Sequence, residues 1–484
     1  MMGIHGVGPK TAKHLYEQVG VDSVEKLEEL AKAHKLAGLP GIKAKTEENI
    51  LKGIAVWRGG RERMPLGTAL TLAEAILARL RDLPQVDQIE AAGSLRRMKE
   101  TVKDIDILVT SKEPARVMDV FVGLPNVAEV LAHGETKSSI RLRESIAVDL
   151  RVVEPDCFGA ALQYFTGSKQ HNIRVREMAQ RKGLKVSEYG VFNEKTDRRV
   201  AGKTEVEVYK AVGLPFIPPE LREDGGEIEA AQDGRLPTLV SLPDIRGDLQ
   251  MHTTWSDGAH SLAELAEGVR AKGYQYMAVT DHSKSATVAG GMKDDQVLQM
   301  IAAVRVINKK LKGFRVLAGC EVDIRGDGTL DFSDAILRQL DLVLVSVHSR
   351  FKMSREEMTA RIVRAVQHPL VHLLGHPTGR LIGERGAYEV DMEAVLTAAR
   401  AAGTAVEINA SPSRLDLNDL HARRAKDLGI PVAVNTDAHT IGQLDNMRFG
   451  VSVARRAWLT PKDVVNAWPE KLLVSWLDKK RSRT

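Results

Sequence analysis

Two aspartates in one short apolar run are the residues of this chain whose spacing most directly predicts chemistry. Asp104 and Asp106 alternate with Ile105 and Ile107, a pattern typical of a strand. Because successive side chains on a strand point to opposite faces, both carboxylates should lie on one face and both isoleucines on the other. Two carboxylates at such a short distance repel each other unless a cation lies between them, and Mg²⁺ prefers carboxylate and phosphate oxygens. The pair predicts a divalent metal site, although the two residues alone would also fit a solvated strand face.

Residues on either side of this strand add the groups that a phosphate substrate needs. Gly93 and Ser94 form a predicted turn that offers backbone N–H groups and a hydroxyl, and Arg96 or Arg97 offers a fork of guanidinium donors. A second alternating run carries Asp149 among its outward positions, which supplies a third carboxylate. Three carboxylates beside a phosphate-binding turn indicate two-metal phosphoryl transfer.

This combination resembles the nucleotidyltransferase core of family X DNA polymerases, the group of DNA polymerase beta, over roughly the first half of the chain. The segment from Tyr164 to Ser168 is part of the resemblance; by itself its aromatic pair would indicate a buried strand end. The resemblance implies that Asp104, Asp106 and Asp149 are catalytic and bind Mg²⁺ or Mn²⁺. It further implies nucleotide binding by Gly93, Ser94, Arg97, Tyr164, Phe165, Gly167, Asn172 and Arg176.

The first 62 residues contain two glycine hairpins of the kind that joins two helices. The second copy is complete, with predicted helices over 24–35 and 45–56. Glycines allow a tight turn whose N–H groups face a DNA phosphate without contacting a base, whereas the alternative is ordinary helix packing with glycine at a helix end. We expect a helix-hairpin-helix module that binds DNA through Gly6, Gly8, Lys10, Gly41, Lys43 and Lys45.

The printed sequence starts inside the first of these hairpins. In the polymerases that it resembles, a lysine-rich lyase domain precedes the helix-hairpin-helix region and binds the 5′-phosphate of a gap. We therefore expect this sequence to lack the lyase domain.

The second half of the chain, from Asp244 onward, alternates short apolar runs with helical segments. This predicts parallel β/α units or a barrel, in which the carboxyl ends of the strands meet at one mouth. Imidazole and carboxylate groups at those ends suit a Zn²⁺ or Mn²⁺ site, although a single histidine there is more often structural. The predicted metal ligands are His252, Asp257, His282, Glu321, His348, His376, Asp437 and His439.

This series resembles the polymerase and histidinol phosphatase (PHP) domain, a metal-dependent phosphoesterase, over residues 244–455. The resemblance implies up to three Zn²⁺ or Mn²⁺ ions. One position departs from the family, which usually begins with His-x-His, because this chain has Gln250 two residues before His252. We therefore expect one ion to be held more weakly.

Together the halves resemble bacterial and archaeal family X polymerases with a C-terminal PHP domain. That resemblance implies gap filling in DNA repair, such as base excision repair, with a metal-dependent 3′→5′ exonuclease or phosphodiesterase activity. The implied partners are gapped or primer-template DNA and deoxynucleoside triphosphates. Two rivals stay open: the polymerase-like half serves only as a DNA clamp for a phosphoesterase, or the PHP half is a structural platform that has lost its metals.

Composition sets outer limits on these expectations. The 484 residues are 43% hydrophobic and 27% charged, with a net charge of +5 that permits a nucleic-acid partner. Only two cysteines occur, and no secretory signal or membrane-length apolar run is present, so we expect a cytoplasmic protein. The resemblance implies a bacterial or archaeal source, and we expect the chain to act as a monomer.

The predicted fold class is multidomain α+β and α/β. Five segments are expected: helix-hairpin-helix fingers (1–62), a nucleotidyltransferase palm (63–156), a small αβ thumb (157–216), a proline-rich linker (217–243) and a distorted β/α barrel (244–484).

Overall fold

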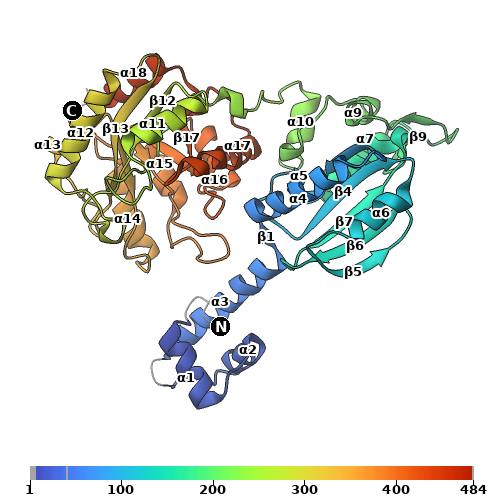
Figure 1. The fold of residues 1–484 in the computed structure, drawn as a ribbon, viewed down its shortest axis with the longest axis horizontal. Helices are drawn as coiled ribbons and strands as arrows, with labels where there is room; N and C mark the ends of the chain where they lie inside the picture. Colours follow the sequence, from blue (N-terminus) through green and yellow to red (C-terminus); the bar gives the residue numbers. More distant parts are fainter. Residues whose placement is uncertain (1–6, 40–41, 482–484) are drawn as a thin grey trace. The chain divides into compact units, whose positions relative to one another are not determined.

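The computed structural model describes residues 7–39 and 42–481 (Figure 1). The chain forms two compact units, Met1–Leu236 with Leu381–Gly386, and Pro237–Arg380 with Ala387–Thr484. Part of the stretch expected as a linker is folded, because the 3₁₀ turn η2 (Pro219–Leu221) and helix α10 (Glu227–Gln232) carry buried side chains. The five predicted segment boundaries remain a prediction. None of the described helices combines the length and apolar character that a membrane span requires.

Three helices form the N-terminal part of the first unit: α1 (Pro9–Val19), α2 (Val24–Lys32) and α3 (Ala44–Glu62). Ser23 caps α2 by accepting the N–H of Lys26 at 3.3 Å, and Gly20 ends α1 in the left-handed conformation at φ 63°. Leucines and isoleucines from all three helices make a separate small core, including Leu15, Leu27 and Ile50.

The turn between α2 and α3 is held by one buried carboxylate. Glu47 accepts the N–H groups of Leu36 and Ala37 at 2.8 Å each, and its other oxygen lies 2.8 Å from His34 Nδ1. The N–H of Gly38 then donates to the carbonyl of Ile42 at 3.1 Å, which closes the hairpin. These contacts confirm a helix-hairpin-helix arrangement over the described residues; Gly6 and Gly41 lie outside them.

A five-stranded mixed sheet follows, in the order β2-β4-β7-β6-β5. Its strands are β2 (Val86–Ala91), β4 (Asp104–Ser111), β5 (Val127–His133), β6 (Lys137–Leu142) and β7 (Ala147–Val152). Strands β4 and β7 are parallel, and the other neighbours are antiparallel. Helices α4 (Leu66–Arg81) and α6 (Pro114–Val122) pack against β2 and β6, and the short strands β1 (Met64–Pro65) and β3 (Thr101–Val102) pair beside them.

A smaller αβ part completes the first unit. It contains the 3₁₀ turn η1 (Pro155–Cys157), helices α7 (Phe158–Thr166), α8 (Lys169–Gln180) and α9 (Glu205–Val212), and strands β8 (Leu184–Ser187), β9 (Gly190–Asn193) and β10 (Arg199–Ala201). The three strands form an antiparallel sheet in the order β10-β9-β8. Since the aromatic pair Tyr164 and Phe165 lies in α7, the alternative reading of that pair as a strand end is wrong.

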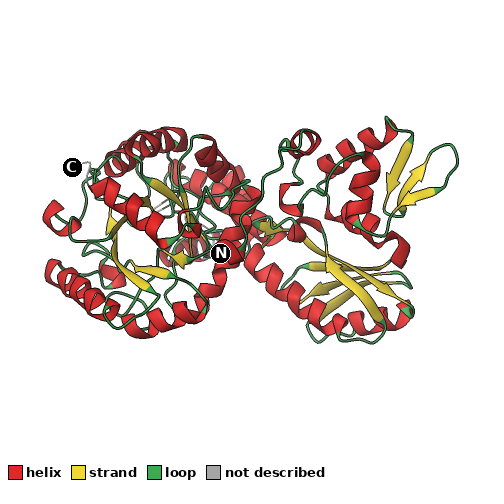
Figure 2. Ribbon diagram, turned by 90° about the horizontal axis from the view of Figure 1, so that it is seen from above, coloured by secondary structure: helices red, strands yellow, loops and turns green. Residues whose placement is uncertain are grey.

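The second unit is a nearly closed barrel of seven parallel strands (Figure 2). The strands are β11 (Gly247–Asp248), β12 (Tyr276–Val279), β13 (Arg315–Asp323), β14 (Leu342–Ser346), β15 (Leu373–Leu374), β16 (Ala405–Asn409) and β17 (Val432–Asn435). Beyond the last strand, a bridge from Met251 to Ala438 joins the two edges. The predicted β/α barrel is therefore confirmed.

Helices lie outside the strands, as Figure 2 shows. They are α11 (Leu262–Ala271), α12 (Asp294–Asn308), α13 (Asp334–Leu337), α14 (Arg355–Val366), α15 (Met392–Ala402), α16 (Asp419–Asp427) and α17 (Met447–Arg456). Short 3₁₀ turns connect them at η3 (Leu242–Asp244), η4 (Thr287–Ala289), η5 (Ile441–Asn446) and η6 (Val465–Ala467).

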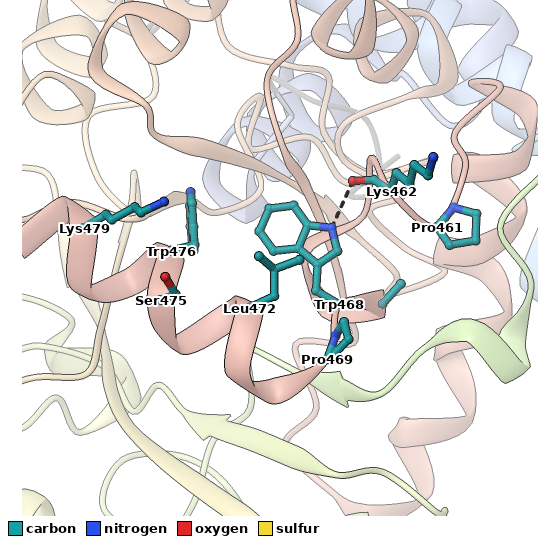
Figure 3. Close-up of a pocket in the computed structure, with 9 residues that line it drawn as sticks. Pro461, Lys462, Trp468, Pro469, Leu472, Ser475, Trp476 and Lys479 are labelled. Carbon is teal, nitrogen blue, oxygen red and sulfur yellow. Dashed lines mark hydrogen bonds between the residues drawn. The ribbon is translucent and has the colours of Figure 1, made fainter.

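The last helix, α18 (Glu470–Arg481), closes one end of the barrel core. Its Leu473 and Leu477 are buried against residues that start the strands, such as Leu342 and Ala405. Trp476 on this helix meets Trp468, which precedes the helix, edge to face at 6.1 Å in a pocket of about 460 Å³ (Figure 3). Because α18 covers the amino ends of the strands, the carboxyl ends are the open mouth.

Candidate functional site

The first site lies where the parallel strands β4 and β7 meet. Asp106 is directly opposite Asp149 in the register, so their side chains lie on one face of the sheet. Asp104 lies two residues before Asp106 on the same strand and therefore on the same face. Ile105 and Ile107 are fully buried on the other face. The structure therefore brings the three predicted carboxylates onto one surface.

Their mutual repulsion is visible in the acidity of Asp106. Burial, followed by the charges of Asp104 and Asp149, raises the pKa of Asp106 to about 6. Asp149 is drawn toward other partners: its Oδ1 accepts the Ser139 hydroxyl at 2.6 Å, and its Oδ2 lies 3.2 Å from Lys137 Nζ. A divalent cation at this surface would relieve the repulsion.

The turn before β4 requires glycine at position 93. Its φ is +64°, and a Cβ atom there would lie 2.4 Å from Asp106 Oδ2. Gly93 also begins the short helix α5 (Gly93–Arg96), which carries Ser94, so the predicted phosphate-binding groups adjoin the carboxylates.

The two arginines of this turn contact the αβ part of the same unit. Arg96 donates to both oxygens of Glu205, at 2.9 and 2.6 Å, and to the Thr166 hydroxyl at 2.7 Å. Arg97, the predicted triphosphate ligand, donates to Glu223 at 2.9 Å and to the Thr166 carbonyl at 2.6 Å. Both guanidinium groups thus link the turn to the end of α7.

The other predicted nucleotide ligands gather around the same helix end. Tyr164 and Phe165 meet edge to face at 5.2 Å, and Gly167 ends α7 with φ 70°. Asn172 donates to the carbonyl of Tyr164 at 2.7 Å. Arg176 lies on α8, which also carries Asn172, and is half-buried. No described contact tests their roles toward a nucleotide.

The second site lies at the carboxyl ends of the barrel strands and is centred on Glu321, which is buried in β13. One of its oxygens lies 2.8 Å from His376 Nε2 and 3.2 Å from His348 Nε2. The other lies 3.4 Å from His252 Nε2 and 3.5 Å from His282 Nδ1. Four imidazoles from four different strand ends therefore converge on one carboxylate.

The remaining predicted ligands surround the same group. Asp437 Oδ1 lies 3.1 Å from His252 Nε2. The rings of His252 and His439 stack at 4.2 Å, and His439 Nε2 lies 3.3 Å from Asp257 Oδ1. All eight predicted ligands are thus together at the mouth.

Opposite charges set the acidity of these groups. Burial acts against the charged form of His252, but the hydrogen bond and charge of Asp437 raise its pKa to about 9. Burial likewise opposes charging of His348, yet Glu321 and Asp323 raise its pKa to about 10. Burial dominates at His282 and lowers its pKa to about 4. Protons and cations therefore compete for the imidazoles of His252 and His348.

Buried polar atoms without a hydrogen-bond partner show that this cluster fits metal ions. Among the described residues they include His252 Nδ1, His282 Nδ1, Glu321 Oε2 and His376 Nδ1. Within the part of the chain that the structure describes, three groups have ligand atoms that all lie within 4.8 Å of one another: His252 with Asp257, His282 and His439; His282 with Glu321 and His348; and His252 with Glu321 and Asp437. The palm carboxylates do not form such a group within the described part of the chain.

Sequence reasoning missed the residues that hold these ligands in place. Glu407, fully buried in β16, accepts the N–H of His376 at 2.7 Å, and Asn409 donates to Asp437 Oδ2 at 3.0 Å. Asp323 contacts His348 Nδ1 at 2.6 Å. A glutamate inside an otherwise apolar parallel strand was the signal that could have identified Glu407.

The predicted DNA-binding lysines lie in the helical part of the first unit. Lys43 and Lys45 are exposed beside the hairpin, and Lys45 Nζ lies 2.9 Å from Glu48. Gly8 caps α1, which also carries Lys10. These positions suit contact with a phosphate backbone, but no described contact tests it.

The mixed sheet with its carboxylate face and the barrel with its histidine cluster define a class of protein. It is a nucleotidyltransferase palm carried on the same chain as a metal-dependent phosphoesterase barrel. Family models match in three places: a SAM-like helix-hairpin-helix tandem over residues 1–55, a DNA polymerase beta thumb over 161–223 and a PHP domain over 248–411.

Two curated relatives agree with this class. The chain is 41% identical over 469 residues to the DNA polymerase/3′-5′ exonuclease PolX of Bacillus subtilis (strain 168), covering 96% of this chain and 82% of that protein. It is 31% identical over 246 residues to a probable phosphatase of Thermoanaerobacter sp. (strain X514), covering 48% of this chain and 96% of that one. A Leishmania infantum polymerase beta structure, a ternary gap complex, matches 46% of this chain and 88% of its own at 22% identity, with a TM-score of 0.31.

The chain therefore belongs to the PolX family, the family X DNA polymerases that carry a C-terminal PHP domain. The predicted family and fold class are confirmed.

Proposed function

We propose that the chain is a DNA-directed DNA polymerase that fills short gaps during repair and also shortens 3′ ends with its PHP barrel. The observation that carries the polymerase half is the register of β4 and β7, which sets Asp106 beside Asp149 next to the Gly93 turn. The observation that carries the exonuclease half is the convergence of four imidazoles on Glu321.

In the polymerase site, Asp104, Asp106 and Asp149 would hold Mg²⁺ or Mn²⁺. When bound, such ions neutralise a triphosphate and increase the acidity of the attacking hydroxyl. Ser94 and Arg97 would bind the phosphates of a deoxynucleoside triphosphate. Since Arg97 contacts Glu223 and the end of α7 in this structure, a nucleotide at the turn would compete for its donors.

In the barrel, the eight ligands would hold up to three Zn²⁺ or Mn²⁺ ions. When bound, such ions polarise a phosphodiester and supply a nucleophile at neutral pH. Glu407 and Asn409 keep His376 and Asp437 in position, as partners of ligands usually do. The pocket at this mouth, of about 480 Å³, also includes Arg414, whose charge suits a phosphate.

The helix-hairpin-helix part would position gapped or primer-template DNA through its exposed lysines and the N–H groups of its hairpins. The rival in which the first half is only a DNA clamp has one supporting observation, because the palm carboxylates do not meet as tightly as the barrel ligands within the described residues. Burial raises the pKa of Asp106, and the mutual repulsion of the three carboxylates, which raises it further, explains that separation as well.

One experiment tests both halves. A gapped primer-template is incubated with the full chain and Mn²⁺, with and without nucleotides. We expect extension when nucleotides are present and shortening when they are absent. Shortening without any extension would support the rival in which the first half is only a DNA clamp. Extension without shortening would support a barrel that has lost its metals.

A further inference from the structure

One buried amide in the barrel has no role in the chemistry described so far. Gln250 is fully buried, and its Oε1 has no hydrogen-bond partner among the described residues. Its Nε2 lies 3.4 Å from Asp437 Oδ1, at the outer limit for a hydrogen bond. A buried amide oxygen without a partner is costly, so its position needs an explanation.

The neighbours of Gln250 show what its side chain faces. Asp437 Oδ1, the atom nearest its amide, also lies 3.1 Å from His252 Nε2. The opposite oxygen, Asp437 Oδ2, is occupied by Asn409 at 3.0 Å and lies 3.6 Å from Arg414 Nε. The amide of Gln250 therefore meets the oxygen of Asp437 that belongs to the group with His252 and Glu321.

One oxygen of that group also lacks the hydrogen bond that burial demands. Glu321 Oε2 is buried without a hydrogen-bond partner in the described chain, 3.4 Å from His252 Nε2. Adding Gln250 Oε1 gives two partnerless oxygens beside a carboxylate and an imidazole. An amide exchanges its nitrogen and oxygen by a half-turn of its last side-chain torsion, which would place Oε1 beside Asp437 Oδ1.

Two oxygens at such a short distance would repel each other unless a cation lay between them. We infer that Gln250 is the fourth protein ligand of the His252, Glu321 and Asp437 group, that it binds through its neutral amide oxygen, and that it shifts this position from Zn²⁺ toward Mn²⁺. The inference rests on the proposed metal centre of the exonuclease.

The shift follows from the donor set. With Gln250 the group offers three oxygens and one imidazole nitrogen, and carboxylate and carbonyl oxygens suit Mn²⁺, whereas imidazole suits Zn²⁺. A histidine in place of Gln250 would give two nitrogens and two oxygens. An alanine would leave His252, Glu321 and Asp437 and remove only the amide oxygen. The ratio of Mn²⁺ to Zn²⁺ affinity therefore depends on this side chain.

The test is a titration of the chelator-treated full chain with MnCl₂ and with ZnCl₂ in separate experiments. All proteins carry Asp106→Asn, which weakens ion binding in the palm. Calorimetry gives the dissociation constants, and elemental analysis gives the number of ions bound. The variants are Gln250→His and Gln250→Ala, with Gln339→Ala as control, since Gln339 is an exposed glutamine that contacts the carbonyl of Ala335. Circular dichroism checks that each variant folds.

At the position formed by His252, Glu321 and Asp437, we expect Gln250→Ala to weaken Mn²⁺ binding by roughly 10- to 100-fold and Zn²⁺ binding by less. We expect Gln250→His to strengthen Zn²⁺ binding relative to Mn²⁺ by a similar factor. Gln339→Ala should change neither constant. If Gln250 only donates to Asp437, alanine should weaken both ions equally, and that result would overturn the inference.

The outcome also separates this inference from the proposed function. If the chain binds both ions but their ratio is the same in both Gln250 variants, the inference alone fails. If the chain with Gln250 intact binds neither ion in the barrel, the metal centre fails and the inference fails with it.

Discussion

Asp106 should separate the two activities, because it belongs to the palm and takes no part in the barrel cluster. Replacing it by asparagine keeps its size and removes the charge that would bind the ion. We expect Asp106→Asn to reduce primer extension at least about 100-fold, since the ions that activate the hydroxyl lose a shared ligand. Metal-dependent shortening should stay within about twofold of the unmodified chain, because mutations at distant, independent sites do not couple.

The matched control is Glu113→Gln, an exposed carboxylate of the same unit that pairs with Arg116 at 3.4 Å. It should leave both activities unchanged. Equal loss of extension and shortening in Asp106→Asn would contradict the assignment of two sites.

The acidity of Asp106 predicts how pH and Mg²⁺ act on stability. Its folded pKa of about 6 lies above the usual 3.8, so the folded chain binds this proton more tightly than the unfolded chain. The stabilisation is complete below about pH 4 and is lost as pH rises through about 6. Mg²⁺ binds the ionised carboxylates, so it should raise the melting temperature more at about pH 8 than at about pH 5.

Asp106→Asn removes the titrating group and serves as the reference. The extra stabilisation by Mg²⁺ at the higher pH should fall in this variant by about 2 to 4 °C, the shift that about 1 kcal/mol produces in a unit of this size. Scanning fluorimetry measures it. An identical Mg²⁺ response in both proteins would show that the three carboxylates do not share an ion.

Gly93 lies where the turn of α5 meets the carboxylate of Asp106. Both its φ of +64° and the 2.4 Å approach of a Cβ to Asp106 Oδ2 oppose any side chain at this position. Gly93→Ala should therefore reduce primer extension about 10-fold or more, because a shift of about 1 Å in a catalytic group has effects of this order. Steady-state kinetics on a one-nucleotide gap measure this.

Gly183→Ala is the matched control, because Gly183 has a nearly equal φ of +67° and nothing within 4 Å of a Cβ. Both variants should lose about 1 to 2 kcal/mol of stability from the left-handed backbone. Only Gly93→Ala should lose activity. Equal losses of activity would mean that backbone strain, not the contact with Asp106, is responsible.

The hairpin of the helical part should bind the phosphates of DNA and not its bases. Lys43 and Lys45 are exposed beside it, and neither is buried among other groups. Changing both to glutamate should weaken binding of gapped DNA equally across sequences and reduce the slope of log K against log salt by about 2. Fluorescence anisotropy over a range of salt concentrations measures both quantities.

The control changes Lys309 and Lys312 to glutamate, which alters the net charge equally at two exposed lysines of the barrel unit. That pair should leave the slope almost unchanged. A changed preference between DNA sequences in the hairpin variant would contradict binding through phosphates.

Much of the fold could be predicted because its signals are local. Alternating residues predicted β4 and β7, and polar residues at the ends of the barrel strands predicted the eight side chains that lie together at the mouth. The prediction for the mouth depends only on chain direction, because the parallel strands of a barrel have their carboxyl ends at the same end whatever the length of the loops between them.

What could not be predicted depends on contacts between residues far apart in the chain. One partner of Arg97 is Glu223, 126 positions later, and no local pattern links them. The bond from Asn409 to Asp437 likewise spans 28 positions. The expected linker shows a different limit: prolines and charges indicated an open chain, but Glu227 is buried there and its carboxylate lies 2.7 Å from His171 Nδ1.

At the scale of the whole molecule, the two sites are built from different units. Asp104, Asp106 and Asp149 lie in the unit containing residues up to Leu236, and the barrel cluster lies in the other. Each predicted set of ligands therefore lies within one unit. Two variants, each inactive at one site, should consequently complement each other without exchanging any part of the chain.

We predict this outcome for Asp106→Asn mixed with His439→Ala. Alone, the first should only shorten a primer and the second only extend it, because His439 is one of the group with His252, Asp257 and His282. His368→Ala, a histidine that lies 3.3 Å from Asp334 away from the cluster, is the control for the second variant. An equimolar mixture should show both activities at about half the rate of the same total amount of unmodified chain, as expected for independent sites. The chain carrying both substitutions should show neither activity. Loss of extension in His439→Ala would contradict independent sites, because polymerase activity would then require an intact barrel.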